Sequence, residues 1–415
     1  MLAVFVSLSI AATAPLRLAE LLKEAREKNP DVRAAELRAQ AANAAVSPSG
    51  ALDDPTLMLQ LWNAPIDFST VPVMLQLSQS IPLGGKREIR RETSAAESRA
   101  ASANAAAQKR DVQALVAKAY FDLYLAERTA EVDDEIEKTL QTLLNAALAR
   151  VRTGTTQQVE ALKVQSAIIQ TQSAREIARQ QAVSARARLG ALLSRAPGEL
   201  VGPTTAPGVL PSLPLPEELE QRALRERPEL RAAAATIEGA NGRAALARAE
   251  KVPDLGVFAA EMHSFGMQGV SDFIFAGVQI NLPIFSGSKN DPRIAAARAQ
   301  AEAEREAERG LRSKIASDVA EAYAQVRTEE KVVALHHQLI PITRQALESA
   351  AAGYGVGRTD FLIVLDTLRE LQSHELELAM HLAAYEQRLA DLEHAVGADL
   401  GLVEASEAGH ADQHL

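Results

Sequence analysis

The segment Asn29–Ala35, NPDVRAA, is repeated in similar form at Arg227–Ala233, RPELRAA. This internal repeat determines the fold of the chain. Three further pairs recur at nearly the same spacing: Ser80–Leu83 with Asn281–Ile284, Ala119–Tyr120 with Ala322–Tyr323, and Val151–Gly154 with Tyr354–Gly357. The offset grows only from 198 to 203 residues, so the whole chain is one duplicated unit. Every other motif must fit the architecture that such a duplication fixes.

The composition favours long, closely packed helices, because alanine is abundant, only 4% of the 415 residues are aromatic and 24% are charged. The formal net charge of −10 argues against a nucleic-acid partner, since binding to phosphates needs a basic surface. The absence of cysteine excludes disulfides, thiolate metal sites and a cysteine nucleophile. We find no catalytic constellation, and therefore expect neither an enzyme nor a cofactor.

The N-terminal segment, residues 1–14, is expected to be a signal peptide, because it is almost wholly apolar and ends in the small residues Ala12-Thr13-Ala14. The alternative is a frayed apolar N-terminus. No other stretch approaches the roughly 20 apolar residues that a membrane-spanning helix needs. If the chain crosses a membrane, it must therefore use strands.

Proline and glycine placement indicates how the chain is divided. Residues 15–196 form the first structural repeat and residues 217–398 the second, joined by a proline-rich linker at 197–216 and followed by a polar tail at 399–415. Each repeat is expected to contain a helix, a pair of strands and a long helical hairpin. The helices are predicted at about 16–47 and 217–250, and the strand pairs at about 55–82 and 253–283.

The helical hairpins are predicted at 84–196 and 290–397. The first is free of proline, carries apolar residues at helical spacing, and is interrupted by a turn at Gly154. Its first arm of ~65 residues would be ~100 Å long at 1.5 Å per residue. In the second hairpin, apolar residues follow the 3.5-residue period of a coiled coil between Leu371 and Val396. Pro341 is expected to kink the outgoing arm or to weaken its helical bonding.

The strand segments alternate between apolar and polar residues, as in Val73–Ser80. Such segments are typical of a transmembrane β-barrel, although an amphipathic hairpin on a soluble core is the alternative. Four strands cannot close a barrel, which needs about eight, and two amphipathic hairpins cannot bury their own apolar seams. Both difficulties disappear in an oligomer. A homotrimer would form a 12-stranded barrel and an α-barrel from its long hairpins, giving a mainly α fold with a membrane β-barrel.

Several motifs resemble those of the TolC-type outer-membrane efflux protein family. They are Pro228-Glu229-Leu230, Val252-Pro253-Asp254-Leu255, and the second hairpin turn, Tyr354-Gly355-Val356-Gly357-Arg358-Thr359, with the run Phe361–Asp366 after it. The segment Ser80–Arg87 is similar to the strand-to-helix junction of the heavy-metal branch that contains CzcC and CusC.

The resemblance implies a homotrimeric channel in the bacterial outer membrane, in contact with its lipid and with a large periplasmic portion. It further implies two partners, a periplasmic adaptor protein and an inner-membrane RND-type pump, and heavy-metal cations as substrate. Drug efflux and type I secretion are the alternatives within the family. A soluble coiled-coil scaffold is the alternative from another class.

The resemblance also assigns candidate working residues. Asp366 aligns with the aspartate at the periplasmic constriction, where Ile363 stands one turn earlier and Asp360 is expected to cap the helix. These three residues are the predicted periplasmic gate. The hairpin turns are the predicted adaptor-docking tips, formed by Arg152, Thr153, Gly154, Gly357, Arg358 and Thr359. We expect the glycines there to form the turns.

The eight histidines do not predict a metal site. Adjacent His336 and His337 point about 100° apart on a helix, so the two cannot chelate together. His374 and His381 are expected to be packed or solvated. The tail segment His410–His414 could hold a metal only weakly.

Overall fold

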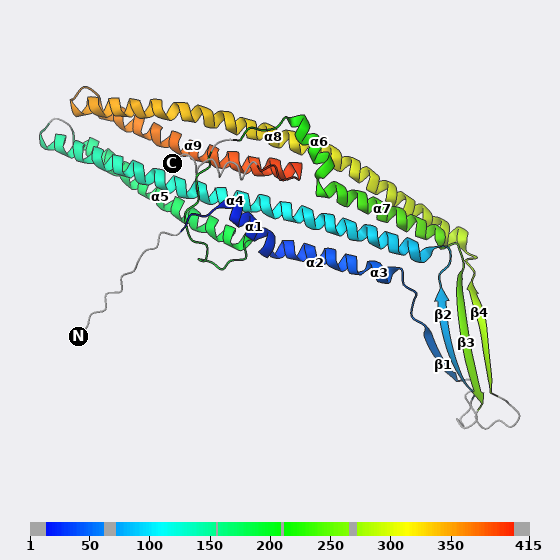
Figure 1. Cartoon of the computed structure of the whole chain (residues 1–415). Helices are drawn as coiled ribbons and strands as arrows, with labels where there is room; N and C mark the ends of the chain where they lie inside the picture. Colours follow the sequence, from blue (N-terminus) through cyan, green and yellow to red (C-terminus); the bar gives the residue numbers. More distant parts are fainter. Residues whose placement is uncertain (1–13, 62–71, 155–156, 209–210, 265–271, 402–415) are drawn as a thin grey trace, which may run out of the picture. The chain divides into compact units, whose positions relative to one another are not determined.

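The computed structural model describes residues 14–61, 72–154, 157–208, 211–264 and 272–401, which fall into two compact units (Figure 1). The first unit comprises residues 1–33, 107–227 and 314–415, and the second comprises 34–106 and 228–313. Each unit therefore takes residues from both sequence repeats. The predicted signal peptide, 1–14, and the tail, 399–415, lie almost entirely outside the described residues.

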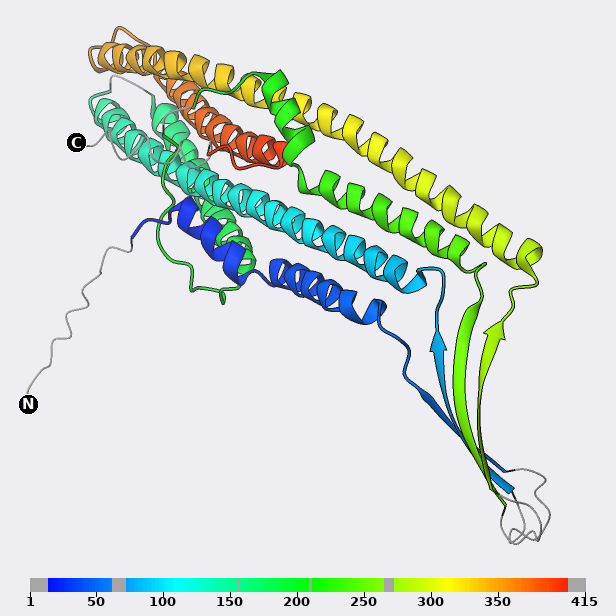
Figure 2. The same cartoon turned by 45° about the vertical axis from the view of Figure 1, so that its right-hand side comes forward.

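A four-stranded antiparallel sheet lies in the second unit. Its strands β1 (Thr56–Leu61), β2 (Pro72–Ile81), β3 (Asp254–Ser264) and β4 (Phe273–Asn281) follow one another in chain order (Figure 2). β1 pairs with β2 and β3 with β4, so each repeat supplies one hairpin of the sheet. Pairing of β2 with β3 then joins the two repeats. The fold is thus mainly helical with a small sheet, as the sequence predicted.

One face of this sheet is apolar and exposed. Directly opposite residues of paired strands share a face, and the register places Leu59 opposite Leu75 and Val257 opposite Val278. The exposed apolar side chains of this face are Leu57, Leu59, Leu61, Leu75, Leu77, Val257, Ile274, Val278 and Ile280. The opposite face of β2 carries Gln76, Ser78 and Ser80. An apolar surface of this extent marks contact with a membrane or a partner.

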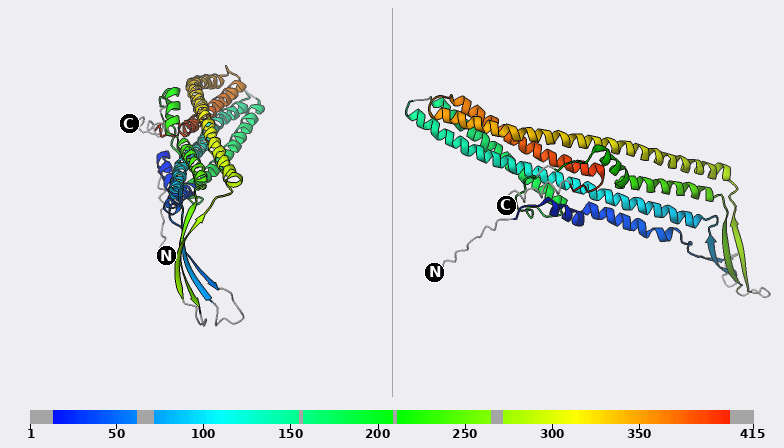
Figure 3. Two further views of the ribbon diagram at one scale, coloured as in Figure 1. Left: turned by 90° about the vertical axis from the view of Figure 1, so that its right-hand side faces the viewer. Right: turned by 45° about the horizontal axis from the view of Figure 1, so that its top comes forward.

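Two long helical hairpins account for about half of the chain. In the first unit, α5 (Gln158–Leu192) returns beside α4 (Lys86–Arg152), and α9 (Phe361–Val396) returns beside α8 (Asp291–Gly355) (Figure 3). α4 has 67 residues, which corresponds to ~100 Å. Pro341 lies inside α8, which continues through it. Among the described residues, no helix combines the length and the apolarity needed to cross a bilayer.

The shorter helices differ from the prediction. The helix expected at 16–47 is divided into α1 (Leu18–Lys28), α2 (Pro30–Ala44) and α3 (Val46–Ser49), and that at 217–250 into α6 (Pro216–Glu226) and α7 (Pro228–Ala249). The break between α1 and α2 falls at Asn29 and that between α6 and α7 at Arg227, with ψ angles of 129° and 124°. Each of these two residues precedes a proline, which disfavours the helical conformation of its predecessor. The prediction of single helices was wrong at both places for this reason, whereas the break at Ala45, between α2 and α3, does not precede a proline.

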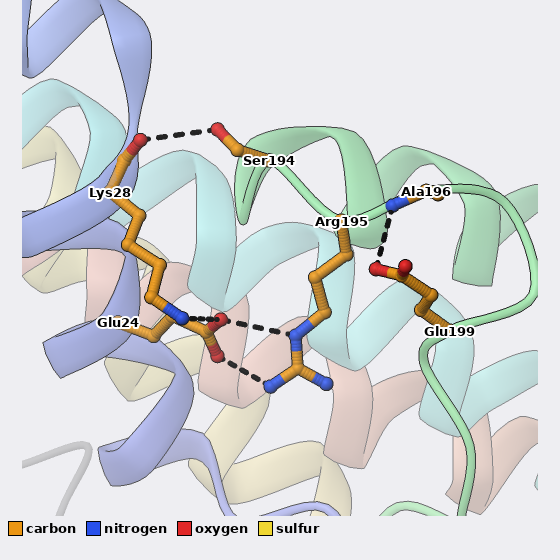
Figure 4. A network of polar contacts seen from close by, with 6 residues as sticks. All are labelled: Glu24, Lys28, Ser194, Arg195, Ala196 and Glu199. Carbon is orange, nitrogen blue, oxygen red and sulfur yellow. Dashed lines mark hydrogen bonds and ion pairs between the residues drawn. The ribbon is translucent and has the colours of Figure 1, made fainter.

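Glu24 fastens α1 to the end of α5. Its two carboxylate oxygens accept hydrogen bonds from Nε and Nη2 of Arg195 at 3.1 and 2.5 Å (Figure 4). Lys28 Nζ lies 3.1 Å from the same carboxylate, and the Ser194 hydroxyl donates to the Lys28 carbonyl at 3.1 Å. The bond from Arg195 lowers the pKa of Glu24, with help from Lys28 and against the effect of burial. The carboxylate is therefore ionised at neutral pH.

A buried lysine joins the two repeats where β2 leads into α4. Lys86 Nζ donates to the carbonyl of Val252 at 2.7 Å and to Asp254 Oδ1 at 2.6 Å. The Lys86 side chain is 4% exposed. The same Asp254 oxygen accepts from the backbone N–H of Leu83 at 3.1 Å. Two of the quoted motifs, Ser80–Arg87 and Val252–Leu255, are thus in direct contact.

Candidate functional site: the hairpin turns and the second hairpin

Both hairpin turns depend on a glycine in the left-handed conformation. Gly154 has φ 70° and Gly357 has φ 74°, values that favour glycine over residues with a Cβ atom. Gly154 N–H donates to the Val151 carbonyl at 3.0 Å, and Gly357 N–H donates to the Tyr354 carbonyl at 3.1 Å. Their shared role is to reverse the chain, as expected from the sequence.

The two turns present basic side chains to solvent. Arg152, Thr153 and Arg358 are exposed, whereas Thr359 is half-buried. The Thr153 hydroxyl donates to the Arg150 carbonyl at 3.0 Å. No hydrogen bond or ion pair of the Arg152 or Arg358 side chain is found within the described part of the chain. Both side chains are therefore exposed at the turns.

The three predicted gate residues lie at the start of α9, Asp360 as its N-cap and the other two within its first two turns. Asp360 caps this helix, because its carboxylate accepts the backbone N–H of Leu362 at 2.8 Å. The Asp366 side chain is 67% exposed, with Arg369 Nη1 3.8 Å away. Ile363 is also exposed, at 53%. Asp366 and Ile363 thus face solvent in the single chain, whereas Asp360 has a structural contact.

Tyr354 links the two hairpins beside their turns, although the sequence identified it only as part of a motif. Its hydroxyl donates to Glu160 Oε2 at 2.9 Å, and its carbonyl accepts from Arg150 Nη1 at 2.7 Å. The Arg150 guanidinium also lies over the ring, 4.4 Å from its centre. Burial, followed by the contact with Glu160, raises the pKa of Tyr354 to about 12. The hydroxyl is therefore a neutral donor at physiological pH.

An apolar cluster packs the hairpins against each other below these polar contacts. α9 contributes Phe361, Val364, Leu365 and Leu368, all at most 3% exposed. α4 and α5 contribute Val132, Ile136, Leu140, Leu143, Leu144, Ala147, Ala161, Val164, Ala167 and Ile168. The start of α9 is consequently held by apolar packing on one side while Ile363 and Asp366 remain exposed on the other.

Asp133 of α4 is a buried acid that faces α9. Its Oδ1 accepts a hydrogen bond from Gln372 Nε2 at 2.8 Å, whereas no partner of Oδ2 is found among the described residues. Burial raises the pKa of this carboxyl, against the lowering effects of Gln372 and Arg175. Asp133 is therefore a second polar contact between the hairpins, and one that favours the protonated acid.

Three histidines and a glutamate meet between α8 and α9. His336 Nε2 lies 3.9 Å from Glu377 Oε2, and His374 Nδ1 lies 3.5 Å from the same oxygen. The His381 ring stacks on His336, with ring centres 5.4 Å apart, and its Nδ1 lies 2.8 Å from Glu329 Oε2. The sequence did not reveal this cluster, although the spacing of His374 and His381 by seven residues, or about two helical turns, was a signal.

Burial and neighbouring groups shift the pKa of two members of the cluster, His336 and Glu377. Burial lowers the pKa of His336, an effect that Glu377 opposes and that His381 and His374 reinforce. Burial also opposes ionisation of Glu377, but the hydrogen bond from Ser373 and the contacts with His374 and His336 prevail and lower the pKa of Glu377. A neutral imidazole thus faces an ionised carboxylate.

The sequence matches the family model described as outer membrane efflux protein over residues 21–195 and 219–398. The cobalt-zinc-cadmium resistance protein CzcC of Cupriavidus metallidurans is 25% identical over 363 residues, which cover 87% of this chain and 85% of CzcC. Both matches confirm the resemblance inferred from the motifs, and they extend over both repeats.

Solved outer-membrane channels share the fold. The channel OprN aligns with a TM-score of 0.80 at 21% identity, covering 92% of this chain and 90% of OprN. CusC aligns with a TM-score of 0.80 at 20% identity, covering 94% of this chain and 96% of CusC. Both alignments thus cover more than nine-tenths of this chain.

Proposed function

The chain belongs to the outer membrane efflux protein family, and we propose that three copies of it form one channel that carries heavy-metal cations out of the cell. As a member of this family it is an outer-membrane efflux channel with a periplasmic portion. The observation that carries this function is the family match across both repeats. The proposal concerns the number of chains, the cargo, the partners and the gate.

The exposed apolar face of the sheet supports closure of a barrel by several chains. Within the described residues, β1 and β4 each pair with one strand, so each leaves one edge of the sheet unpaired. Lipid does not tolerate an open edge, because unpaired backbone groups there have no water to bind. Joining β4 of one copy to β1 of the next removes both edges. Three copies give a 12-stranded barrel whose apolar face meets lipid.

Exposed apolar stripes on the long helices support the same assembly. On α5 the stripe consists of Val159, Leu162, Ile169, Ile177 and Val183, each at least 48% exposed. On α8 it consists of Leu335, Leu339 and Ile342. These positions recur at helical spacing, which is typical of a seam that packs against another helix. Neighbouring copies in a trimer would cover them and complete an α-barrel.

Two observations favour heavy-metal cations as the cargo. The relative CzcC, which aligns over most of both chains, is named as a cobalt-zinc-cadmium resistance protein. The junction Ser80–Arg87 is similar to that of the heavy-metal branch, and its Lys86 is buried in contact with the second repeat. Drug efflux and type I secretion remain the alternatives that the experiment below separates from metal export.

The hairpin turns are the proposed contact with the periplasmic adaptor, which would couple the channel to an inner-membrane RND-type pump. Arg152 and Arg358 are exposed, and a guanidinium offers several donors in a fixed geometry to backbone carbonyls. Because the chain has no cysteine, single cysteines at 152 and 358 give unambiguous cross-links. Adducts with the adaptor from both positions are expected, and their absence from both would contradict the docking.

Asp366, Ile363 and Asp360 are the proposed periplasmic gate. Asp366 is exposed, so the three carboxylates of a trimer could face a common axis, repel one another and attract cations. Ile363 adds an exposed apolar side chain one turn earlier. Asp360 sets the start of the gating helix through its cap.

Cell fractionation combined with a deletion strain tests the proposed function. The channel should be extracted from outer membranes by detergent as a trimer, whereas a coiled-coil scaffold would be recovered as soluble protein. Deletion should lower resistance to cobalt, zinc or cadmium salts and leave drug resistance and protein secretion unchanged. A deletion strain that loses drug resistance alone would overturn the metal cargo but keep the channel.

A further inference from the structure

We propose that His336, His374 and Glu377 form a binding site for a divalent transition-metal cation that bridges α8 and α9. One ligand atom from each of these side chains lies within 4.8 Å of the other two. The proposal concerns a site within the second hairpin and does not depend on which cargo the channel exports. It requires only that the two arms pair as the structure has them.

The helical positions of the ligands suit a bridge between the arms. His374 and Glu377 are three residues apart on α9, so their side chains share one face of that helix. His336 comes from α8 and approaches from the opposite arm. The neighbouring His337 is exposed and has no place in the cluster. It therefore serves as a matched control.

One imidazole nitrogen of the site has unused bonding capacity. Nδ1 of His374, which lies 3.5 Å from Glu377 Oε2, is buried, and no hydrogen-bond partner of it is found among the residues that the structure describes. A buried imidazole nitrogen without a partner is unfavourable. A metal ion accepts the lone pair of such a nitrogen, so binding would convert an unfavourable feature into a favourable one.

The chemistry of the ligands selects the class of cation. Two imidazoles and one carboxylate suit Zn²⁺, Co²⁺, Ni²⁺ and Cu²⁺, whereas Mg²⁺ and Ca²⁺ prefer oxygen ligands alone. Tetrahedral coordination with bonds of 2.0–2.1 Å needs ligand atoms ~3.3 Å apart. His374 Nδ1 and Glu377 Oε2 are already 3.5 Å apart, and side-chain rotation of His336 can supply the remaining approach. The partly exposed Glu377 leaves access for the ion.

Residues around the site support the ligands. The Ser373 hydroxyl donates to Glu377 Oε1 at 3.0 Å, which leaves Oε2 for the cation. The His381 ring stacks on His336, and Glu329 in turn holds Nδ1 of His381. Contacts of this kind fix the orientation of metal ligands in proteins. We assign His381 to positioning rather than to binding.

The first hairpin provides an internal comparison. α5 begins at Gln158 and α9 at Phe361, so a shift of 203 residues relates the two hairpins. The same shift matches His336, His374 and Glu377 with Asp133, Thr171 and Ala174. No imidazole stands at any of these three positions. The cluster thus belongs to the second hairpin specifically, the hairpin that also carries Asp366.

Titration of the purified full-length trimer with Co²⁺ tests the site, because tetrahedral Co²⁺ absorbs visible light and Zn²⁺ should displace it. The protein is prepared without a histidine tag and with His410→Gln and His414→Gln, which removes the tail histidines. One Co²⁺ per chain is expected. His336→Asn, His374→Asn and Glu377→Gln should each weaken binding by about 100-fold or more, since loss of an outer contact alone costs 10–100-fold.

Two control variants, and one ligand variant that preserves the side-chain shape, accompany this test. His337→Asn should bind as tightly as the parent protein, and His381→Gln should weaken binding by only about 10-fold. Glu377→Gln changes a partly exposed side chain of the same shape, so it remains informative if a histidine variant fails to assemble. The proposal is overturned if the parent protein binds no Co²⁺, or if the ligand variants bind as tightly as His337→Asn. Failure of metal export with intact Co²⁺ binding would overturn the cargo alone.

Discussion

The two repeats share a backbone plan but differ in the contacts that their hairpins make. In the first hairpin, Arg175 of α5 pairs with Asp134 at 2.6 Å and with Glu137 of α4. In the second, the arms meet through His336, His374 and Glu377. The arms of the second hairpin also share a charged pair, Arg344 with Glu375 at 2.6 Å. Both hairpins are therefore joined by charged groups, and the second adds the three side chains of the proposed metal site.

We expect the largest difference in stability between the two copies at Tyr354 and at Val151, which stands at the corresponding position of the first repeat. Tyr354→Ala should lower the free energy of unfolding by about 3–5 kcal/mol, because it removes a buried ring and leaves a cavity between the hairpins. Val151→Ala, at a half-buried position, should cost about 1 kcal/mol. Thermal or denaturant unfolding of the detergent-solubilised protein measures both. Equal losses would show that the two turns are held alike.

The two strand-to-helix junctions should differ by almost as much in their contribution to stability. Lys86→Ala leaves Asp254 without its buried cation, and we expect a loss of about 3 kcal/mol. The matching Lys289 lies in the π-helical turn Ser286–Asn290 (η2) and is exposed, so Lys289→Ala should change stability by less than about 0.5 kcal/mol. The same unfolding measurement compares them. A neutral Lys86→Ala would contradict a structural role for this junction.

Glu24 gives a smaller effect that depends on pH. Glu24→Gln weakens the contact with Arg195 and should cost about 1 kcal/mol at pH 7. The pKa of Glu24 is lower in the folded protein than in the unfolded chain, so its ionisation stabilises the fold above the unfolded value. This advantage over the glutamine variant should be lost as the pH falls through the folded pKa.

A melting-temperature series from neutral to acid pH measures this dependence, with Glu20→Gln as the control, because Glu20 is an exposed glutamate of the same helix. A gap between wild type and Glu24→Gln that stays constant at all pH values would contradict the assignment. The second repeat places Arg222 at the matching position, so the contact belongs to the first repeat alone.

Asp133, the counterpart of His336, should show the smallest change and the opposite sign. Burial raises the pKa of Asp133 in the fold, so the ionised acid is unfavourable at neutral pH. Asp133→Asn keeps an acceptor for Gln372 and should leave stability unchanged or raise it by up to about 1 kcal/mol at pH 7. The advantage should shrink as the pH falls and wild-type Asp133 becomes protonated.

Asp134→Asn is the matched control for this change, since it weakens the ion pair with Arg175 and should lower stability. Unfolding at pH 7 and at acid pH compares the two variants. If Asp133→Asn were the more destabilising of the two at pH 7, the buried carboxyl would be ionised and favourable, contrary to the account.

The duplication, the alternating strands and the hairpin turns could be recognised from the sequence because each depends on local periodicity or on a glycine. The helix breaks at Asn29 and Arg227 also have a local cause in the sequence, because a proline directly follows each residue. Other contacts join residues far apart, such as Lys86 with Asp254, 168 positions away, and Tyr354 with Glu160, 194 positions away. Sequence reasoning missed them because they depend on how the arms align.

The histidine cluster illustrates the same limit. The spacing of His374 and Glu377 places both on one face of α9, which the sequence alone can indicate. Whether His336 of the opposite arm reaches that face depends on the length of the turn and the pairing of α8 with α9. The structure supplies this register, and with it the candidate site.

Conductance of single channels in planar bilayers tests most directly whether the second hairpin carries the gate. Asp366→Ala is compared with Lys163→Ala, because both residues are exposed and Lys163 stands 203 residues earlier, at the corresponding position of the first hairpin. Asp366→Ala should change the conductance or the block by divalent cations, whereas Lys163→Ala should leave both as in the wild type. Unchanged conductance and block in Asp366→Ala, or equal changes in the two variants, would contradict the gate assignment.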